Sequence, residues 1–277
     1  MIAGKIRGIG RVTVEQVEGL GAFTRFCFSA AWWIVRGAGQ WGRVRLLTPQ
    51  LFNIGTRSIP VVAVVGAFVG MVLAVEAYEQ FAAIGQDVRL GGVINISVVK
   101  QVGPVLAAIM IAGRVGGAVA AELGTMRVTE QIDAMRVMGA DPVSYLVVPR
   151  VIACVVMVPL LTVFSDLTGI FGGYLVTVQG YGVNGAAYWD FSARFIGNWD
   201  VGIGLIKSVF FGLAIGLISC FKGFYCRPGA AGVGRAATDA FVTSFLAIIV
   251  ANFFLAKLLK DLYVVIFGHG GVTAFSG

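Results

Sequence analysis

The stretch that decides the fold is Gly103-Pro-Val-Leu-Ala-Ala-Ile-Met-Ile-Ala-Gly-Arg-Val-Gly-Gly-Ala-Val-Ala-Ala-Glu122, continued by Leu-Gly-Thr-Met-Arg-Val-Thr-Glu-Gln-Ile-Asp-Ala-Met-Arg-Val-Met-Gly-Ala-Asp-Pro142. Its first half is apolar and rich in small residues, as in a membrane helix that packs closely against other helices. Its second half is polar, and each ion at bilayer depth costs about 2.5–3.5 kcal/mol. We therefore expect a spanning helix that ends here and a short polar helix in water beyond it.

The composition is that of a protein embedded in a lipid bilayer. Of the 277 residues, 58% are hydrophobic and 13% are charged, whereas a soluble domain has about a quarter charged residues. The apolar residues fall in long blocks, which predicts an all-α integral membrane protein. The net charge of +7 is explained better by orientation in a membrane than by nucleic acid, so no nucleic-acid partner is expected.

Metal binding and histidine-based catalysis are not expected. The four cysteines form no CxxC pair, and His269 is the only histidine. A zinc site or a catalytic triad needs several such groups together. The sequence therefore predicts no metal, no cofactor and no disulfide framework.

Five apolar segments are long enough to cross roughly 30 Å of hydrocarbon. They are residues 59–77, 93–121, 146–178, 201–221 and 241–259. Glycines spaced four apart occur in or beside them, at positions 66 and 70, 113 and 117, 169 and 173, and 212 and 216. Such pairs let helix backbones approach closely. We expect ordinary helix packing from them, with a specific role in dimerisation or gating as the alternative.

The N-terminal region, residues 1–58, is basic and differs from the rest. Its apolar run 22–35 is interrupted by Arg25 and bounded by Arg36, and it is too short to cross the bilayer. Because Trp and Arg on one helix suit the headgroup boundary, we expect an interfacial helix, with an ordinary first span as the alternative. Residues 59–277 then form the transmembrane bundle of one domain that covers 1–277, and 179–200 is expected to hold a second interfacial helix.

The distribution of basic residues predicts the orientation. With the N-terminus in the cytoplasm, the loops 122–145 and 222–240 share that side with the basic N-terminal cluster, as the positive-inside rule requires. The turn 85–92, the loop 179–200 and the C-terminus then lie on the external side of the membrane. We expect a multi-pass protein in this orientation.

Two glycine patterns resemble nucleotide-binding loops but lack their context. Gly180 to Gly185 fits GxGxxG, and residues 229–236 nearly fit a P-loop except that Arg235 and Ala236 replace Lys and Ser/Thr. Neither pattern follows a predicted strand, as such loops require. We therefore expect no ATP binding and no enzymatic activity in this chain, and any ATP hydrolysis falls to a partner.

Several charged or polar residues lie inside predicted spans. Polar groups at this depth tend to face a cavity or each other. Lys100 and Gln101 could meet a lipid phosphate or ester. The alternative is that the Lys100 side chain snorkels to the membrane surface or pairs with Glu76 or Glu79. Arg114 is expected to make a structural ion pair inside the bundle, with Asp166 and Glu122 as the candidate partners.

The polar segment 122–142 has the composition of a docking helix. Ile132, Met135 and Met138 are expected on one side of a short amphipathic helix, which is a common way to insert apolar anchors into a partner's groove. The alternative is a solvated loop helix. The residues assigned to this segment's partner contact are Glu122, Arg127, Glu130, Gln131, Asp133 and Met135.

These motifs together resemble the MlaE permease family, the membrane subunits of bacterial ABC systems that move phospholipids between the inner and outer membranes. The resemblance rests on the block that begins Gly103-Pro-Val-Leu-Ala-Ala and continues to Pro149-Arg150. It extends over nearly the whole chain through Asn53-Ile-Gly55, Gly70-Met-Val-Leu73, Pro159-Leu-Leu161 and Ile206-Lys-Ser208.

The resemblance implies a homodimer of five-span subunits in the bacterial inner membrane. It also implies a cytoplasmic ABC ATPase dimer docked around residues 130–135, a periplasmic hexamer of MCE-domain subunits and, in some systems, a STAS-domain subunit. A phospholipid would occupy an outward-open pocket, whose lining by position includes Leu73, Phe81, Ile84 and Gln101. Many relatives have Arg-Glu just before the Gly-Pro-Val, where this chain has Lys100-Gln101, so any mechanism that needs an acid there must find it elsewhere, for example at Glu76 or Glu79.

The function that this resemblance implies is a permease subunit that moves glycerophospholipid between the inner membrane and a periplasmic carrier or the outer membrane. A separate ATPase would drive it through residues 122–142. The alternatives are a membrane scaffold that anchors an ATPase or STAS partner without transport, and a permease for another hydrophobic substrate such as a sterol.

Overall fold

The computed structural model describes residues 2–36 and 44–267, and within these residues all regular structure is helical. The longer helices are α1 (Ile2–Arg36), α2 (Val44–Ile54), α3 (Ile59–Ala82), α4 (Leu90–Ser97), α5 (Gly103–Ile111), α6 (Gly117–Val128), α7 (Gln131–Val137), α8 (Val148–Tyr174), α9 (Gly185–Phe195), α10 (Asn198–Phe224) and α11 (Ala230–Phe267). Short helices of other types connect many of them. The 3-10 helices are η2 (Thr56–Ser58) and η3 (Asp87–Arg89), and the π-helical segments are η4 (Val98–Val102), η5 (Ala112–Gly116), η6 (Val143–Val147) and η7 (Leu175–Gly180).

Joined end to end, these elements make five rods in the described part of the chain that are long and apolar enough to cross a membrane. They are Leu46–Ala82, Asp87–Val128, Val143–Gly180, Asn198–Phe224 and Ala230–Ile266. Each contains one predicted span, so the prediction of an all-α, five-span membrane protein is confirmed. The first and last rods are longer than predicted, because α2 continues into α3 and α11 begins eleven residues before 241.

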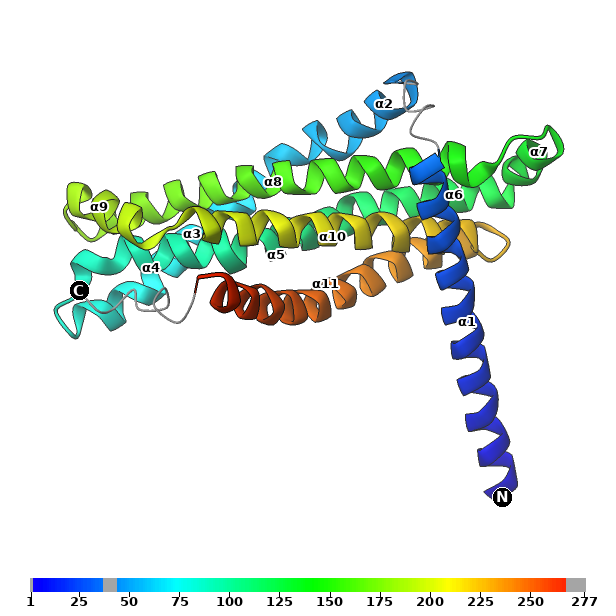
Figure 1. The fold of residues 1–277 in the computed structure, drawn as a ribbon, viewed down its shortest axis with the longest axis horizontal. Coiled ribbons are helices and arrows are strands. Elements are labelled where there is room, and N and C mark those ends of the chain that lie inside the picture. Colours follow the sequence, from blue (N-terminus) through cyan, green and yellow to red (C-terminus); the bar gives the residue numbers. More distant parts are fainter. Residues whose placement is uncertain (1, 37–43, 268–277) are drawn as a thin grey trace.

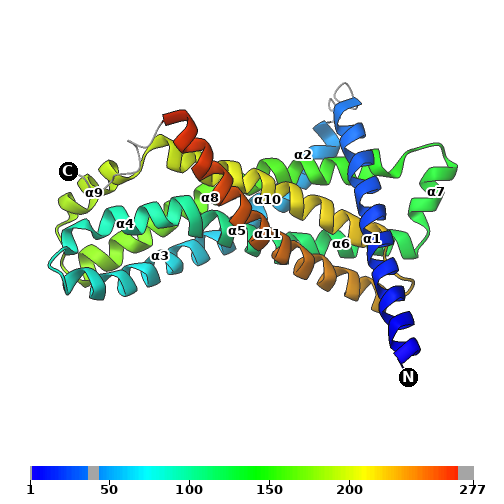
Figure 2. The ribbon, with the colours of Figure 1, turned by 60° about the horizontal axis from the view of Figure 1, so that its bottom comes forward.

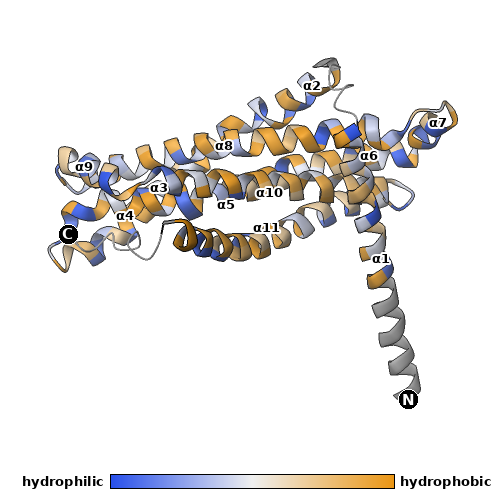
Figure 3. Ribbon diagram, viewed as in Figure 1, coloured by the Kyte–Doolittle hydropathy of each residue, from blue (hydrophilic) through white to orange (hydrophobic). Residues whose placement is uncertain are grey.

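The rods lie side by side and give the bundle two distinct ends (Figure 1). One end carries α9 together with the turn between α3 and α4, and it is called the α9 end below. The opposite end carries α7 and the C-terminal end of α10, and it is called the α7 end. Hydrophobic residues dominate the rods, while hydrophilic residues gather at α7 and the α9 end (Figure 3).

Helix α1 crosses the bundle at the α7 end instead of running along it, as Figures 1 and 2 both show. Phe26 is buried, and its ring centroid lies 5.6 Å from that of Phe221 and 5.8 Å from that of Phe224. Phe28 and Trp32 remain exposed, so the helix is apolar on its outer side as well. This is the arrangement expected of an interfacial helix. The side chains of Lys5, Arg7 and Arg11, and all of His269, lie outside the described residues.

Glycine allows the tightest helix crossing, between α3 and α8. A Cβ atom on Gly70 would collide with the backbone carbonyl of Gly169, and one on Gly66 would lie 2.6 Å from the carbonyl oxygen of Ser165. The pair at 212 and 216 similarly packs α10 against Cys154 and Val151 of α8. The spacing of four therefore serves packing within one chain at these crossings, as expected.

Helix α9 is fastened to α4 by a buried polar network. The Tyr188 hydroxyl donates to Asn95 Oδ1 at 2.9 Å, and Asn95 Nδ2 donates to Ser192 Oγ at 2.8 Å. Burial raises the pKa of Tyr188 to about 12, so the hydroxyl keeps its proton at neutral pH. Because buried polar groups need partners, this network holds α9 in one position, and the predicted short helix in 179–200 is present.

Candidate functional site

A cavity of about 740 Å³ lies near the α9 end, between the second rod, the α9–α10 connection and the end of α11. Both Lys100 and Gln101, predicted to line a pocket, are in its wall. The full lining is Ile96, Ser97, Lys100, Gln101, Arg194, Phe195, Gly197, Trp199, Asp200, Ile203, Lys207, Ala256, Lys260 and Tyr263.

Lys100 is held by a carboxylate from a distant part of the chain. Its Nζ lies 2.7 Å from Asp200 Oδ1. The other carboxylate oxygen of Asp200 accepts from the backbone N–H of Gly197 at 3.1 Å, which caps the start of α10. The alternative partners Glu76 and Glu79 are exposed on α3 and do not line the cavity. The acid beside Lys100 is therefore Asp200.

Lys207 is a buried cation of the cavity that sequence reasoning missed, as it missed Asp200. It is 1% exposed, and its Nζ donates to Gln101 Oε1 at 2.6 Å and to the Lys100 carbonyl at 3.2 Å. That carbonyl is free because its usual helical partner four residues on is Pro104, which has no N–H. In the π-helical segment η4, the Lys100 carbonyl that lacks this helical hydrogen bond therefore accepts from Lys207. A lysine in the middle of an apolar span was the signal that could have identified it.

The charge in this cavity is predominantly positive. Lys100, Lys207, Arg194 and Lys260 line it, and Asp200 is the one acidic residue in the lining. Arg194 is also paired with Asp190 at 2.9 Å. Phe195, Trp199 and Tyr263 supply aromatic surface in the same wall. Cationic donors beside aromatic and apolar side chains can bind an anionic group attached to an apolar body.

The other residues predicted for a lipid pocket lie apart from this cavity. Leu73 and Phe81 are partly buried in a small apolar cluster with Tyr78 and Tyr181, whose rings stack with centroids 3.8 Å apart. Ile84 is exposed in the turn after α3. Lys100 and Gln101 are thus brought together, whereas the three apolar residues form a separate surface at the same end of the bundle.

The ion pair predicted for Arg114 is not present among the described residues. Arg114 Nη1 donates to Ser58 Oγ, and Glu122 pairs instead with Arg150 of α8 at 3.1 Å. Asp166 is buried against Gly103, where a Cβ would collide with its carboxylate, and its Oδ1 has no hydrogen-bond partner among the described residues. The prediction failed because helix spacing alone does not say which carboxylate faces which arginine.

The polar segment does form a short helix, α7, that projects beyond the bundle (Figure 1). Asp133 lies 2.7 Å from Arg127 and 3.0 Å from Arg136, so it ties α7 to the end of α6. Glu130, which precedes α7, has a φ of 60°, a backbone conformation uncommon outside glycine. Glu130 and Gln131 are exposed, and Met135 is half-buried.

The apolar face of α7 differs from the prediction in one respect. Ile132 is 0% exposed and belongs to the main core of its own chain, so it cannot insert into a partner. Val137 and Met138 are instead 89% and 76% exposed. Large apolar side chains at such exposure on a polar, projecting element are typical of a contact surface.

Among the described residues, no group of three or more His, Cys, Asp or Glu side chains is placed to hold a metal ion. The site features are a cationic cavity at one end of a five-span bundle and a projecting helix at the other. Together they define a multi-pass membrane protein of the transporter class.

The chain belongs to the family described as Permease MlaE, whose sequence profile matches residues 47–258. It is 41% identical over 250 residues to a probable ABC transporter permease protein of Rickettsia conorii, which covers 90% of this chain and 95% of that protein. It is 31% identical over 261 residues to the intermembrane phospholipid transport system permease protein MlaE of Haemophilus influenzae, which covers 94% of this chain and 98% of the relative. A probable ABC transporter permease of Synechocystis is 43% identical over 210 residues, covering 76% of this chain and 80% of that protein. The chain is therefore an ABC transporter permease of the MlaE family.

Proposed function

We propose that this permease moves glycerophospholipid between the inner membrane and a periplasmic carrier or the outer membrane, and that it has no enzymatic activity of its own. The observation that carries the proposal is the 740 Å³ cavity, in which Lys100 and Lys207 lie beside aromatic surface. A phosphate group suits the two ammonium groups, and acyl chains suit the apolar residues at the same end. The name of the Haemophilus relative supports the same substrate.

The transport unit in this proposal is a homodimer with soluble partners at both ends. A cytoplasmic ABC ATPase dimer docks on α7, and a periplasmic hexamer of MCE-domain subunits, in some systems with a STAS-domain subunit, completes the assembly. The N-terminus and α7 then lie in the cytoplasm, and the C-terminus and the cavity mouth face the periplasm. Residues 1–277 act as one domain, with 1–58 at the membrane surface and 59–277 as the bundle.

Transport then requires that the two ends be coupled. ATP-driven closure of the partner would move α7. The ion pairs of Asp133 with Arg127 and Arg136, called the Asp133 clamp below, would transmit that movement to α6, which is part of the second rod. The same rod carries η4 and Lys100. A bistable rigid-body change of this kind shifts occupancy only if the two states bind lipid differently.

Mass spectrometry of lipid co-purified with the intact complex tests the substrate. We expect glycerophospholipid at stoichiometric level, and a permease for another hydrophobic molecule would carry that molecule instead. A scaffold that only anchors an ATPase or STAS partner would carry no lipid at stoichiometric level. Either of the last two results would overturn the proposed substrate.

A further inference from the structure

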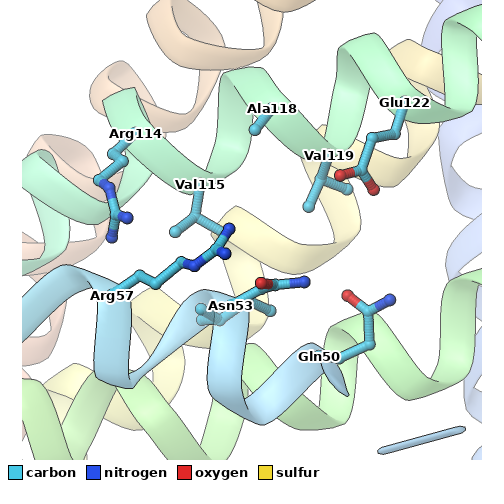
Figure 4. A pocket seen from close by; sticks show the side chains of 9 residues that line it. Gln50, Asn53, Arg57, Arg114, Val115, Ala118, Val119 and Glu122 are labelled. Carbon is cyan, nitrogen blue, oxygen red and sulfur yellow. The ribbon is translucent and has the colours of Figure 1, made fainter.

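A second, smaller pocket of about 230 Å³ lies on the α7 side of the bundle, between α2–η2 and η5–α6. Figure 4 shows Arg114 and Glu122 at opposite ends of the wall that η5 and α6 form, with Arg57 and Asn53 reaching toward that wall from the neighbouring rod. The nine lining residues are Gln50, Asn53, Ile54, Arg57, Arg114, Val115, Ala118, Val119 and Glu122. The residues of the 740 Å³ cavity are all different, so this is a separate site.

The charge in this pocket is not balanced by the described residues around it. Glu122 is the one carboxylate in the lining, and it already lies 3.1 Å from Arg150. Among the described residues Arg114 donates to the neutral Ser58 hydroxyl alone, and Arg57 lies over the Phe52 ring at 5.8 Å. Neither arginine has a carboxylate within ion-pair distance among the described residues. Two guanidinium groups are therefore available to an anion.

The pocket also has the donors that a phosphate needs. Guanidinium groups bind phosphate through paired N–H donors. The side-chain amides of Gln50 and Asn53 line the same space and make no hydrogen bond to another described residue. Four side chains can thus donate to the oxygens of one anion.

The surroundings favour an anion that belongs to a lipid. Both arginines lie within candidate membrane spans, where a cation without an anionic partner is unfavourable. Phe52, Val61, Val64 and Phe68 are exposed on the rod that carries Arg57. Val61, Val64 and Phe68 recur at helical spacing after Arg57, and Phe52 lies under the Arg57 guanidinium, so exposed apolar side chains that can contact an acyl chain lie on the same rod as this arginine.

We infer that Arg57 and Arg114 bind the phosphate group of a membrane lipid at the α7 end, in a site distinct from the cavity at the α9 end. The protein then has a phosphate site near each end of the bundle. This second site does not depend on transport through the first, since its charges and its apolar border are present in the chain whether or not the protein moves lipid.

Native mass spectrometry of the purified complex, titrated with phosphatidylglycerol, tests this site. The variant Arg57→Gln/Arg114→Gln should retain one lipid fewer per chain, with apparent affinity for that lipid lowered at least about tenfold, because charge-assisted hydrogen bonds are lost. Diacylglycerol with the same acyl chains should not bind the site in wild-type protein. The double variant Arg227→Gln/Arg235→Gln removes two exposed arginines outside the pocket, and it should bind as wild type does.

Three results would overturn the inference. The first is an unchanged lipid count in Arg57→Gln/Arg114→Gln. The second is displacement by millimolar inorganic phosphate with no retention of phosphatidylglycerol, which would make this a site for free phosphate. The third is dissociation of the oligomer with unchanged lipid binding, which would mean that the arginines pair with a second copy of the chain. If Lys100→Met lowers the lipid count and Arg57→Gln/Arg114→Gln does not, the proposed function stays intact and only this second site is rejected.

Discussion

Replacing Val137 and Met138 by aspartate is expected to abolish co-purification of the ATPase while the permease remains folded. These side chains are 89% and 76% exposed, so the chain itself loses little packing. At the centre of an interface, however, each new carboxylate would be buried without a partner, at a cost of several kcal/mol. We expect the affinity for the ATPase to fall at least about a hundredfold, measured by pull-down and by titration of the purified subunits.

The control is Val265→Asp, which places one carboxylate on another highly exposed valine, near the end of α11. It should leave ATPase binding unchanged. Wild-type ATPase binding by Val137→Asp/Met138→Asp would reject α7 as the docking element. Reversing the charge of Asp133 is a poorer test. Asp133 forms ion pairs with Arg127 and Arg136 that fix α7 against α6, so its replacement would disturb the helix itself. Glu130→Lys, at an exposed position outside the Asp133 clamp, is the cleaner charge reversal.

The two members of the Lys100–Asp200 ion pair are expected to respond to substitution in opposite directions. If Lys100 binds the lipid phosphate, Asp200 competes with that phosphate for the same ammonium group 2.7 Å away. Lys100→Met should therefore lower phospholipid affinity about tenfold, the loss of one hydrogen bond to a charged group. Asp200→Asn should raise the affinity, and its side-chain oxygen can still accept from Gly197 at the start of α10. Lipid retained per purified complex, measured across a detergent wash series, reports both.

A purely structural ion pair gives a different result. Both variants would then break the same contact, and both would lower thermal stability and lipid retention together. Equal losses in Lys100→Met and Asp200→Asn would contradict a phosphate-binding role for Lys100. The direction of the change in Asp200→Asn separates the two cases, because the binding account expects lipid retention to rise and the structural account expects it to fall.

The architecture was predictable because hydrocarbon imposes strong constraints on sequence. Apolar length decides the spans, and the charges between Glu122 and Pro142 could only lie outside the bilayer, so α7 was predicted with its polar character. The contacts between rods were not predictable in the same way. Arg114 was expected to pair with Asp166 or Glu122, yet Ser58 from a neighbouring rod is its partner. Ile132 was expected to face outward, but it is buried in the core of its own chain.

The cavity shows why part of a site escapes sequence reasoning. Lys100 and Gln101 were found because polar residues in a span are rare. Lys207 and Asp200 come from about a hundred residues further along the chain, and only the packing of α10 on η4 brings them to Lys100. Leu73, Phe81 and Ile84, assigned by resemblance, lie outside this cavity in the single chain. Their role in lipid binding remains a prediction for the dimer.

The most direct test of the central claim is ATP-dependent lipid movement by the reconstituted complex. Proteoliposomes containing the permease, its ATPase and its periplasmic partner would carry a fluorescent glycerophospholipid, and transfer to acceptor vesicles would be followed with and without ATP. The lipid-permease account predicts transfer that requires ATP and is lost in Val137→Asp/Met138→Asp. ATP hydrolysis by the wild-type complex without any lipid transfer would contradict it and would favour a membrane scaffold.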